Sequence, residues 1–181
     1  MGGRLHLYDW HDNIVRRSGY AAEYCSDFDI VTGQCNTASP GNHFAAVASV
    51  PDIAAAIESF GRQMRTIDSI WFHTHGVPGQ VSLPGGNLRA GNVSLLRKAC
   101  DKYLASPAYI YFLGCNVGEG HNGEAFLTVA GSLLLGHGGG SVFASDSVTF
   151  SFPLVGQWRP PHANVIEAVV EPGGQVTIEK H

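Results

Sequence analysis

Short apolar runs alternate with amphipathic helical patterns between residues 43 and 145, and this alternation most constrains the fold. The runs at 43–50, 69–76, 108–115 and 141–145 are typical of buried strands. Apolar residues recur at spacings of three and four in the segments between them, which predicts helices over 53–64, 95–104 and 124–135. Alternating strands and helices predict an α/β fold, with a mostly parallel central sheet and helices on both of its faces.

The two ends of the chain depart from this alternation. Arg4 to Trp10 alternates as a strand does, whereas residues 20–42 are rich in Gly, Ser, Asn and Asp and predict loops. Near the other end, the turn Pro172-Gly173-Gly174 between two apolar runs predicts a β-hairpin. We find no repeat or linker and therefore expect one domain over residues 1–181, with an irregular N-terminal segment at 1–42.

The composition excludes several classes of protein. Hydrophobic residues make up 44% of the 181 residues, and the 14% that are charged give a net charge of −4 with no basic stripe, so we expect no nucleic-acid partner. No apolar run approaches the roughly 20 residues that span a membrane, and the first twelve residues lack the apolar core of a signal peptide. We expect a cytoplasmic protein, or one exported without a classical signal, and no membrane partner. The sequence does not indicate an oligomeric state.

Two of the predicted strands end in reactive residues. One ends in His75-Gly76 and the other in Gly114-Cys115. Strands of a parallel sheet present their carboxyl ends at one edge, so the imidazole and the thiol face each other if the two strands are neighbours. Cys115 also precedes the helix predicted at 124–135, and a helix N-terminus favours the thiolate form of a cysteine. The backbone N–H groups of Gly76 and Cys115 are candidate donors to an oxyanion.

Five motifs occur in an order that carries a family resemblance. They are HTHGVPG, VSLPGGNL, YFLGCNVGEGHNGEAFLTVAG, VFASDS and GQW, within residues 67–158. This set resembles the caspase-like (clan CD type) cysteine peptidases. It is closest to bacterial caspase-like domains of unknown function, with some likeness to separase and gingipain. The resemblance implies a three-layer caspase-like fold and a cysteine endopeptidase that acts on peptide or protein substrates without a cofactor or metal. In that enzyme His75 is the general base, Cys115 is the nucleophile, and a thioester acyl-enzyme forms.

The resemblance also implies where substrate binds. Members of the superfamily often build the pocket for the side chain before the scissile bond (the P1 side chain) from the segment after the next strand, here Ser145 and Asp146. Asp146 would then bind a basic P1 side chain by charge pairing. The chain departs from the family at Leu113, because several members have a polar residue two positions before the cysteine. The P1 preference is therefore open.

Two other functions compete with this interpretation. His73 and His75 form a His-x-His pair that could bind one metal from one strand face. With Ser82 nearby, this resembles the JAB/MPN zinc metallo-isopeptidases, although Gly85 stands where their aspartate is expected. The chain could also be a caspase-like module that binds without turnover. The presence of both His75 and Cys115 favours an active enzyme.

Overall fold

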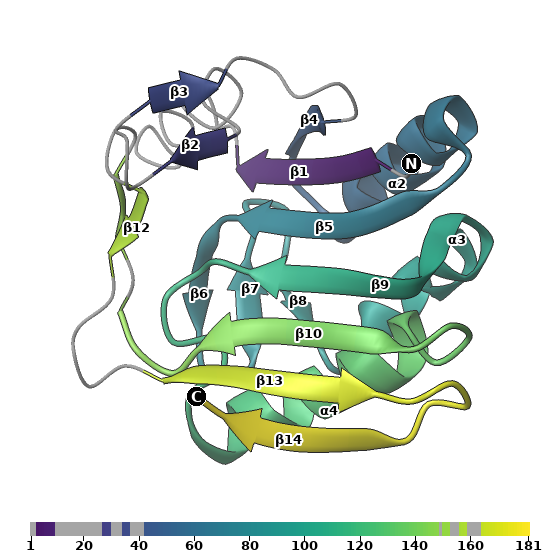
Figure 1. Ribbon diagram of the computed structural model, residues 1–181. Helices are drawn as coiled ribbons and strands as arrows, with labels where there is room; N and C mark the ends of the chain where they lie inside the picture. Colours follow the sequence, from purple (N-terminus) through teal and green to yellow (C-terminus); the bar gives the residue numbers. More distant parts are fainter. Residues whose placement is uncertain are drawn as a thin grey trace.

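The computed structural model describes residues 3–9, 27–29, 34–36, 42–148, 150–152, 156–158 and 164–181. A seven-stranded sheet forms its centre, with the strand order β14-β13-β10-β9-β5-β1-β4 (Figure 1). Its strands are β1 (Gly3–Asp9), β4 (Asn42–Val47), β5 (Ile67–His73), β9 (Leu104–Phe112), β10 (Gly140–Ser145), β13 (Val165–Val170) and β14 (Val176–Lys180).

Five strands of this sheet, from β4 to β10, are parallel to their neighbours, and β13 and β14 run antiparallel at one edge. The α/β class, the mostly parallel sheet and the C-terminal hairpin are thus confirmed. The strand predicted from Arg4 is also confirmed as β1, but sequence did not indicate that it would lie between β4 and β5.

Three helices and one 3-10 turn follow the predicted amphipathic segments. They are α2 (Val50–Met64), η1 (Val93–Leu96), α3 (Arg97–Tyr103) and α4 (Gly120–Leu134). Ser49 caps α2 by accepting a hydrogen bond from the Asp52 N–H through its hydroxyl, and Pro51 lies in the first turn, where it removes no helical hydrogen bond. The helix predicted over 95–104 divides into η1 and α3, and that predicted over 124–135 begins earlier, at Gly120.

All of these helices pack on one face of the sheet. Helix α2 contacts α3 and η1, and α4 contacts α3, η1 and the strands β10, β13 and β14. From β4 through β5 and β9 to β10 the chain advances across the sheet in one direction, so right-handed crossovers place each helix on the same side (Figure 1). Phe72, Phe112 and Phe126 form the buried centre of this interface.

The other face of the sheet, which we call the aromatic face, carries Trp71, Tyr111 and Phe143. Their rings stack across β5, β9 and β10, with centroids 4.0 and 4.9 Å apart. Among the described residues, no helix packs on this face. None of the helices in the described ranges is long and apolar enough to cross a membrane.

Smaller sheets accompany the central one. One is a three-stranded antiparallel sheet of β6 (His75–Val77), β7 (Gln80–Ser82) and β8 (Leu88–Arg89). The other two are antiparallel pairs. They join β2 (Asp27–Asp29) to β3 (Gln34–Asn36), and β11 (Phe150–Phe152) to β12 (Gly156–Trp158). The strand predicted to run to Gly76 therefore ends at His73, and His75 begins a new strand.

Candidate functional site

The strands that precede His75 and Cys115 are direct neighbours. β5 and β9 are parallel, with Phe72 opposite Phe112, and the Leu113 N–H donates a hydrogen bond to the Phe72 carbonyl at 3.1 Å. The two chain segments therefore leave the same edge of the sheet side by side. This confirms the expectation that the imidazole-bearing and thiol-bearing segments meet at the carboxyl ends of the strands.

The two segments touch through their backbones. A Cβ atom added at Gly114 would lie 2.9 Å from the carbonyl carbon of His75 and 3.0 Å from the Gly76 nitrogen. A Cβ added at Gly76 would lie 2.8 Å from the carbonyl oxygen of Cys115. Only glycine allows this approach at both positions, since real Cβ atoms essentially never come this close. His75 is exposed and Cys115 is partly buried, so both border solvent.

The loop that carries Cys115 is fixed on its other side by the end of β10. Asn116 and Gly118 donate backbone hydrogen bonds to the carbonyls of Ser147 and Ser145, at 3.0 and 2.9 Å. Asn116 adopts a left-handed conformation, with φ of 57°, which turns the chain directly after Cys115. Helix α4 then begins at Gly120. The loop is thus held between the His75 segment and the Ser145 segment.

The two residues predicted to bind substrate after β10 have partners within the protein. Both carboxylate oxygens of Asp146 accept hydrogen bonds from Asn164, one from its backbone N–H at 2.8 Å and one from its side-chain amide at 2.7 Å. Ser145 is buried, and its hydroxyl accepts a hydrogen bond from the Ser147 N–H. Asp146 therefore joins the end of β10 to the residue before β13, whatever further role it has.

A pocket of about 240 Å³ opens on the aromatic face beside the Cys115 loop. Sequence analysis did not single it out. A signal was available, because each of the three predicted strands carries an aromatic residue at the matching register position. Among the described residues, its lining consists of Trp71, Tyr111, Phe112, Leu113, Phe143, Ala144, Ser145 and Val165.

A second feature on the aromatic face is a pair of histidines. Nδ1 of His6 lies 3.0 Å from Nε2 of His73, and the His6 ring stacks between Phe44 and the rings of His73 and Trp71. Burial lowers the pKa of His6 to about 3 and that of His73 to about 4. Both imidazoles are therefore neutral at physiological pH. In the metallo-isopeptidase interpretation His73 is a zinc ligand, and binding through its Nε2 atom would break the hydrogen bond to His6.

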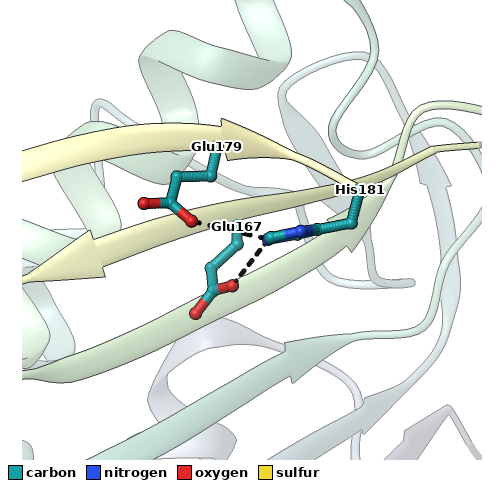
Figure 2. Close-up of side chains that lie close together, drawn as sticks. All are labelled: Glu167, Glu179 and His181. Carbon is teal, nitrogen blue, oxygen red and sulfur yellow. Dashed lines mark hydrogen bonds and ion pairs between the residues drawn. The ribbon is translucent and has the colours of Figure 1, made fainter.

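The side chains that could hold a metal ion within the described ranges are Glu167, Glu179 and His181 (Figure 2). Glu167 and Glu179 stand opposite each other in the β13–β14 pair. The His181 Nε2 atom lies 2.9 Å from an Oε2 of Glu167 and 3.7 Å from that of Glu179. Like charges directly opposite in a hairpin are destabilising, and the His181 imidazole lies within hydrogen-bond distance of Glu167. This cluster lies outside the candidate site.

Comparison with known proteins gives a family but no activity. A family model described as "Domain of unknown function (DUF4347)" matches residues 30–162. No curated protein and no solved structure matches the chain. The matched range covers most of the chain and includes His75, Cys115 and the described helices α2, α3 and α4. The chain therefore belongs to the DUF4347 family.

Proposed function

We propose that this domain is a caspase-like cysteine endopeptidase in which His75 is the general base and Cys115 the nucleophile. The observation that carries the proposal is the backbone contact between the two loops that follow β5 and β9. Gly114 lies against the peptide that joins His75 to Gly76, so the residues on either side of this contact are held at one spot on the edge of the sheet. A nucleophilic thiol and an imidazole at that spot are the two groups that thiol hydrolysis requires.

The reaction would proceed in two steps. The His75 imidazole takes the Cys115 thiol proton as Sγ attacks the carbonyl carbon of the substrate, and the oxyanion accepts hydrogen bonds from the Gly76 and Cys115 N–H groups. The C–N bond then breaks, and the imidazolium gives its proton to the leaving amine. In the second step His75 deprotonates a water molecule that attacks the thioester. This releases the carboxylic acid and restores the thiol.

The test is peptide cleavage by the purified domain and three variants. We expect Cys115→Ala and His75→Ala to lose at least about 100-fold in kcat/KM against an unfolded protein substrate or a mixed fluorogenic peptide library. The matched control is His137→Ala. It removes an exposed imidazole from the turn between α4 and β10, at the opposite edge of the sheet, and should keep full activity.

Covalent labelling gives an independent readout that does not depend on the choice of peptide. A peptidyl chloromethyl ketone should alkylate Cys115 faster than iodoacetamide of equal concentration does, and His75→Ala should remove that difference. If no peptide is cleaved and the two reagents label Cys115 equally, the domain is a binding module on this scaffold. Loss of a bound zinc equivalent with activity in His73→Ala would instead favour the metallo-isopeptidase.

A further inference from the structure

The pocket beside the Cys115 loop has a chemistry that does not match the charge pairing expected from sequence. We infer that it accepts a large apolar or aromatic P1 side chain, an inference that rests on the proposed function. None of its described lining residues carries a charge, and most are aromatic or aliphatic. The polar side-chain groups among these residues are the hydroxyls of Ser145 and Tyr111 and the indole N–H of Trp71. The Ser145 hydroxyl already accepts a hydrogen bond from the Ser147 N–H, and the Trp71 N–H donates one to Ser69.

The position of the pocket relative to the two reacting groups assigns it to the acyl side of the scissile bond. The imidazole must protonate the leaving amine, so the amine half of the substrate lies toward His75, which follows β5. The acyl half then lies on the other side of Cys115, toward β10. Phe143, Ala144, Ser145 and Val165 line the pocket on that side, whereas Trp71 is its one described lining residue from β5. The residue directly before the scissile bond is thus the one whose side chain reaches the pocket.

The loop that carries Cys115 joins the pocket wall on both sides of the nucleophile. Leu113 is two residues before Cys115, and Gly118, three residues after it, donates a hydrogen bond to the Ser145 carbonyl at 2.9 Å. Residues on both sides of Cys115 are therefore tied to the pocket wall. A site for a drug-sized ligand has about 300–1,000 Å³. The 240 Å³ here is smaller and suits one large side chain.

The floor of the pocket favours aromatic and long aliphatic side chains. Trp71, Tyr111 and Phe143 stack in a row across three strands, so their faces contact one another and their edges border the pocket. Offset or edge-on contact with a further ring adds to the apolar area that is buried. A basic side chain would lose its hydration here with no charge among the described lining residues to pair with it. Asp146 is absent from that lining and binds Asn164 through both oxygens.

The test compares three chloromethyl ketones that differ only in P1, namely Phe, Lys and Asp. The rate constant for alkylation of Cys115 is measured for each. We expect the Phe reagent to react at least about 10-fold faster than either charged reagent. Ser145→Asp should then raise the rate of the Lys reagent relative to the Phe reagent, because it places a carboxylate in the pocket. Tyr109→Ala is the matched control. Tyr109 is 39% exposed, lies two residues before Tyr111 on the same strand and does not line the pocket.

The outcomes separate this inference from the proposed function. If Lys or Asp is preferred, the apolar pocket is not the P1 site, but the cysteine peptidase stands. A Lys preference that Asp146→Ala abolishes would restore the role expected from sequence. If all three reagents label Cys115 no faster than iodoacetamide does, both the P1 assignment of the pocket and the proposed function fail. Equal loss of the Phe preference in Ser145→Asp and Tyr109→Ala would also overturn the assignment.

Discussion

Gly114 and His75 lie in backbone contact at the carboxyl edge of the sheet, with 2.9 Å between a Cβ built at Gly114 and the His75 carbonyl carbon. Gly114→Ala must therefore push the two loops apart. We expect a loss of about 1–3 kcal/mol in the free energy of unfolding. We also expect a drop of about 100-fold in peptidase activity, because a displacement of about 1 Å at reacting groups has that effect.

The control for Gly114→Ala is Gly91→Ala, at an exposed glycine with no atom within 4 Å of an added Cβ. Chemical denaturation should show less than about 0.5 kcal/mol of change for this variant. Equal stability and activity in the two variants would show that the close contact does not hold the loops together.

Cys100 and Cys115 differ in their surroundings, and their reactivity should differ with them. Cys100 is buried in α3, and burial, with Asp101 nearby, raises the pKa of its thiol to about 12. Its thiolate is therefore scarce at any pH between 7 and 9. Iodoacetamide followed by peptide mass spectrometry should find Cys115 alkylated and Cys100 intact in the folded protein. In denaturant both should react. Rapid native alkylation of Cys100 would contradict its placement in the core.

The His6–His73 pair predicts a loss of stability on acidification. Both folded-state pKa values, about 3 and about 4, lie below the ordinary value of 6.5. Between the folded-state pKa values and 6.5, the unfolded chain binds more protons than the folded one, so the free energy of unfolding rises with pH. The contribution of the neutral pair to the free energy of unfolding is fully present above about pH 6.5. Below that pH it decreases by about 1.4 kcal/mol per pH unit for each imidazole.

Urea denaturation at several pH values checks this slope. His6→Phe removes one titrating group and keeps a ring for stacking, so its stability should fall less between pH 6.5 and pH 5 than that of the unmodified domain. Phe44→Leu disturbs the stack without removing an imidazole, and its loss of stability should be equal at both pH values. Parallel curves for His6→Phe and the unmodified domain would contradict the buried neutral pair.

Much of the fold could be predicted from sequence because its elements have local signals. The apolar period of α2 and the strand-turn-strand pattern around Pro172 are written in neighbouring residues. The meeting of the His75 and Cys115 segments followed from topology alone, since consecutive parallel strands share an edge.

The features that could not be predicted from the sequence depend on contacts between residues that are distant along the chain. His6 meets His73 only because β1 inserts between β4 and β5, a long-range pairing with no local signal. The end of β5 at His73 was also hidden, because the run to Gly76 is continuous in sequence. His75 leaves the central sheet there to pair with Ser82 of β7. The role of Asp146 in binding substrate is implied by the family resemblance and stays a prediction, whereas its hydrogen bonds to Asn164 join residues 18 positions apart and had no local signal.

The opposed carboxylates of the C-terminal hairpin predict a stabilising role for His181. With the imidazole removed in His181→Ala, Glu167 and Glu179 face each other unscreened across the strand pair. We expect a loss of about 0.2–1 kcal/mol, measured by thermal or urea unfolding at neutral pH. Adding Glu179→Gln to His181→Ala removes the repulsion between the carboxylates and should recover most of the lost stability. A double variant that is no more stable than His181→Ala would contradict this account, and zinc-dependent stabilisation of the unmodified domain would show that the cluster binds metal.

The Asp146–Asn164 pair predicts that Asp146 acts on stability and not on substrate choice. Its carboxylate accepts two hydrogen bonds from one residue, so Asp146→Ala and Asn164→Ala should each destabilise the domain by about 1 kcal/mol or more. Asp146→Ala removes both acceptors, whereas Asn164→Ala keeps the backbone hydrogen bond. Asp146→Ala should therefore lower the free energy of unfolding more than Asn164→Ala does. The double variant should lose little beyond Asp146→Ala alone, because the variants share one interaction.

Substrate choice is measured on the same variants by alkylation with the Phe, Lys and Asp reagents. If Asp146 only joins β10 to β13, the ratio of the Phe rate to the Lys rate stays constant in Asp146→Ala and Asn164→Ala, even where all rates fall together. A ratio that changes in Asp146→Ala but not in Asn164→Ala would mean that the carboxylate reaches the P1 side chain. Asn164→Ala keeps the backbone hydrogen bond to Asp146, so Asp146→Ala is expected to lower all three rates more, and the ratio of rates, not their absolute values, reports a direct role of Asp146 toward substrate.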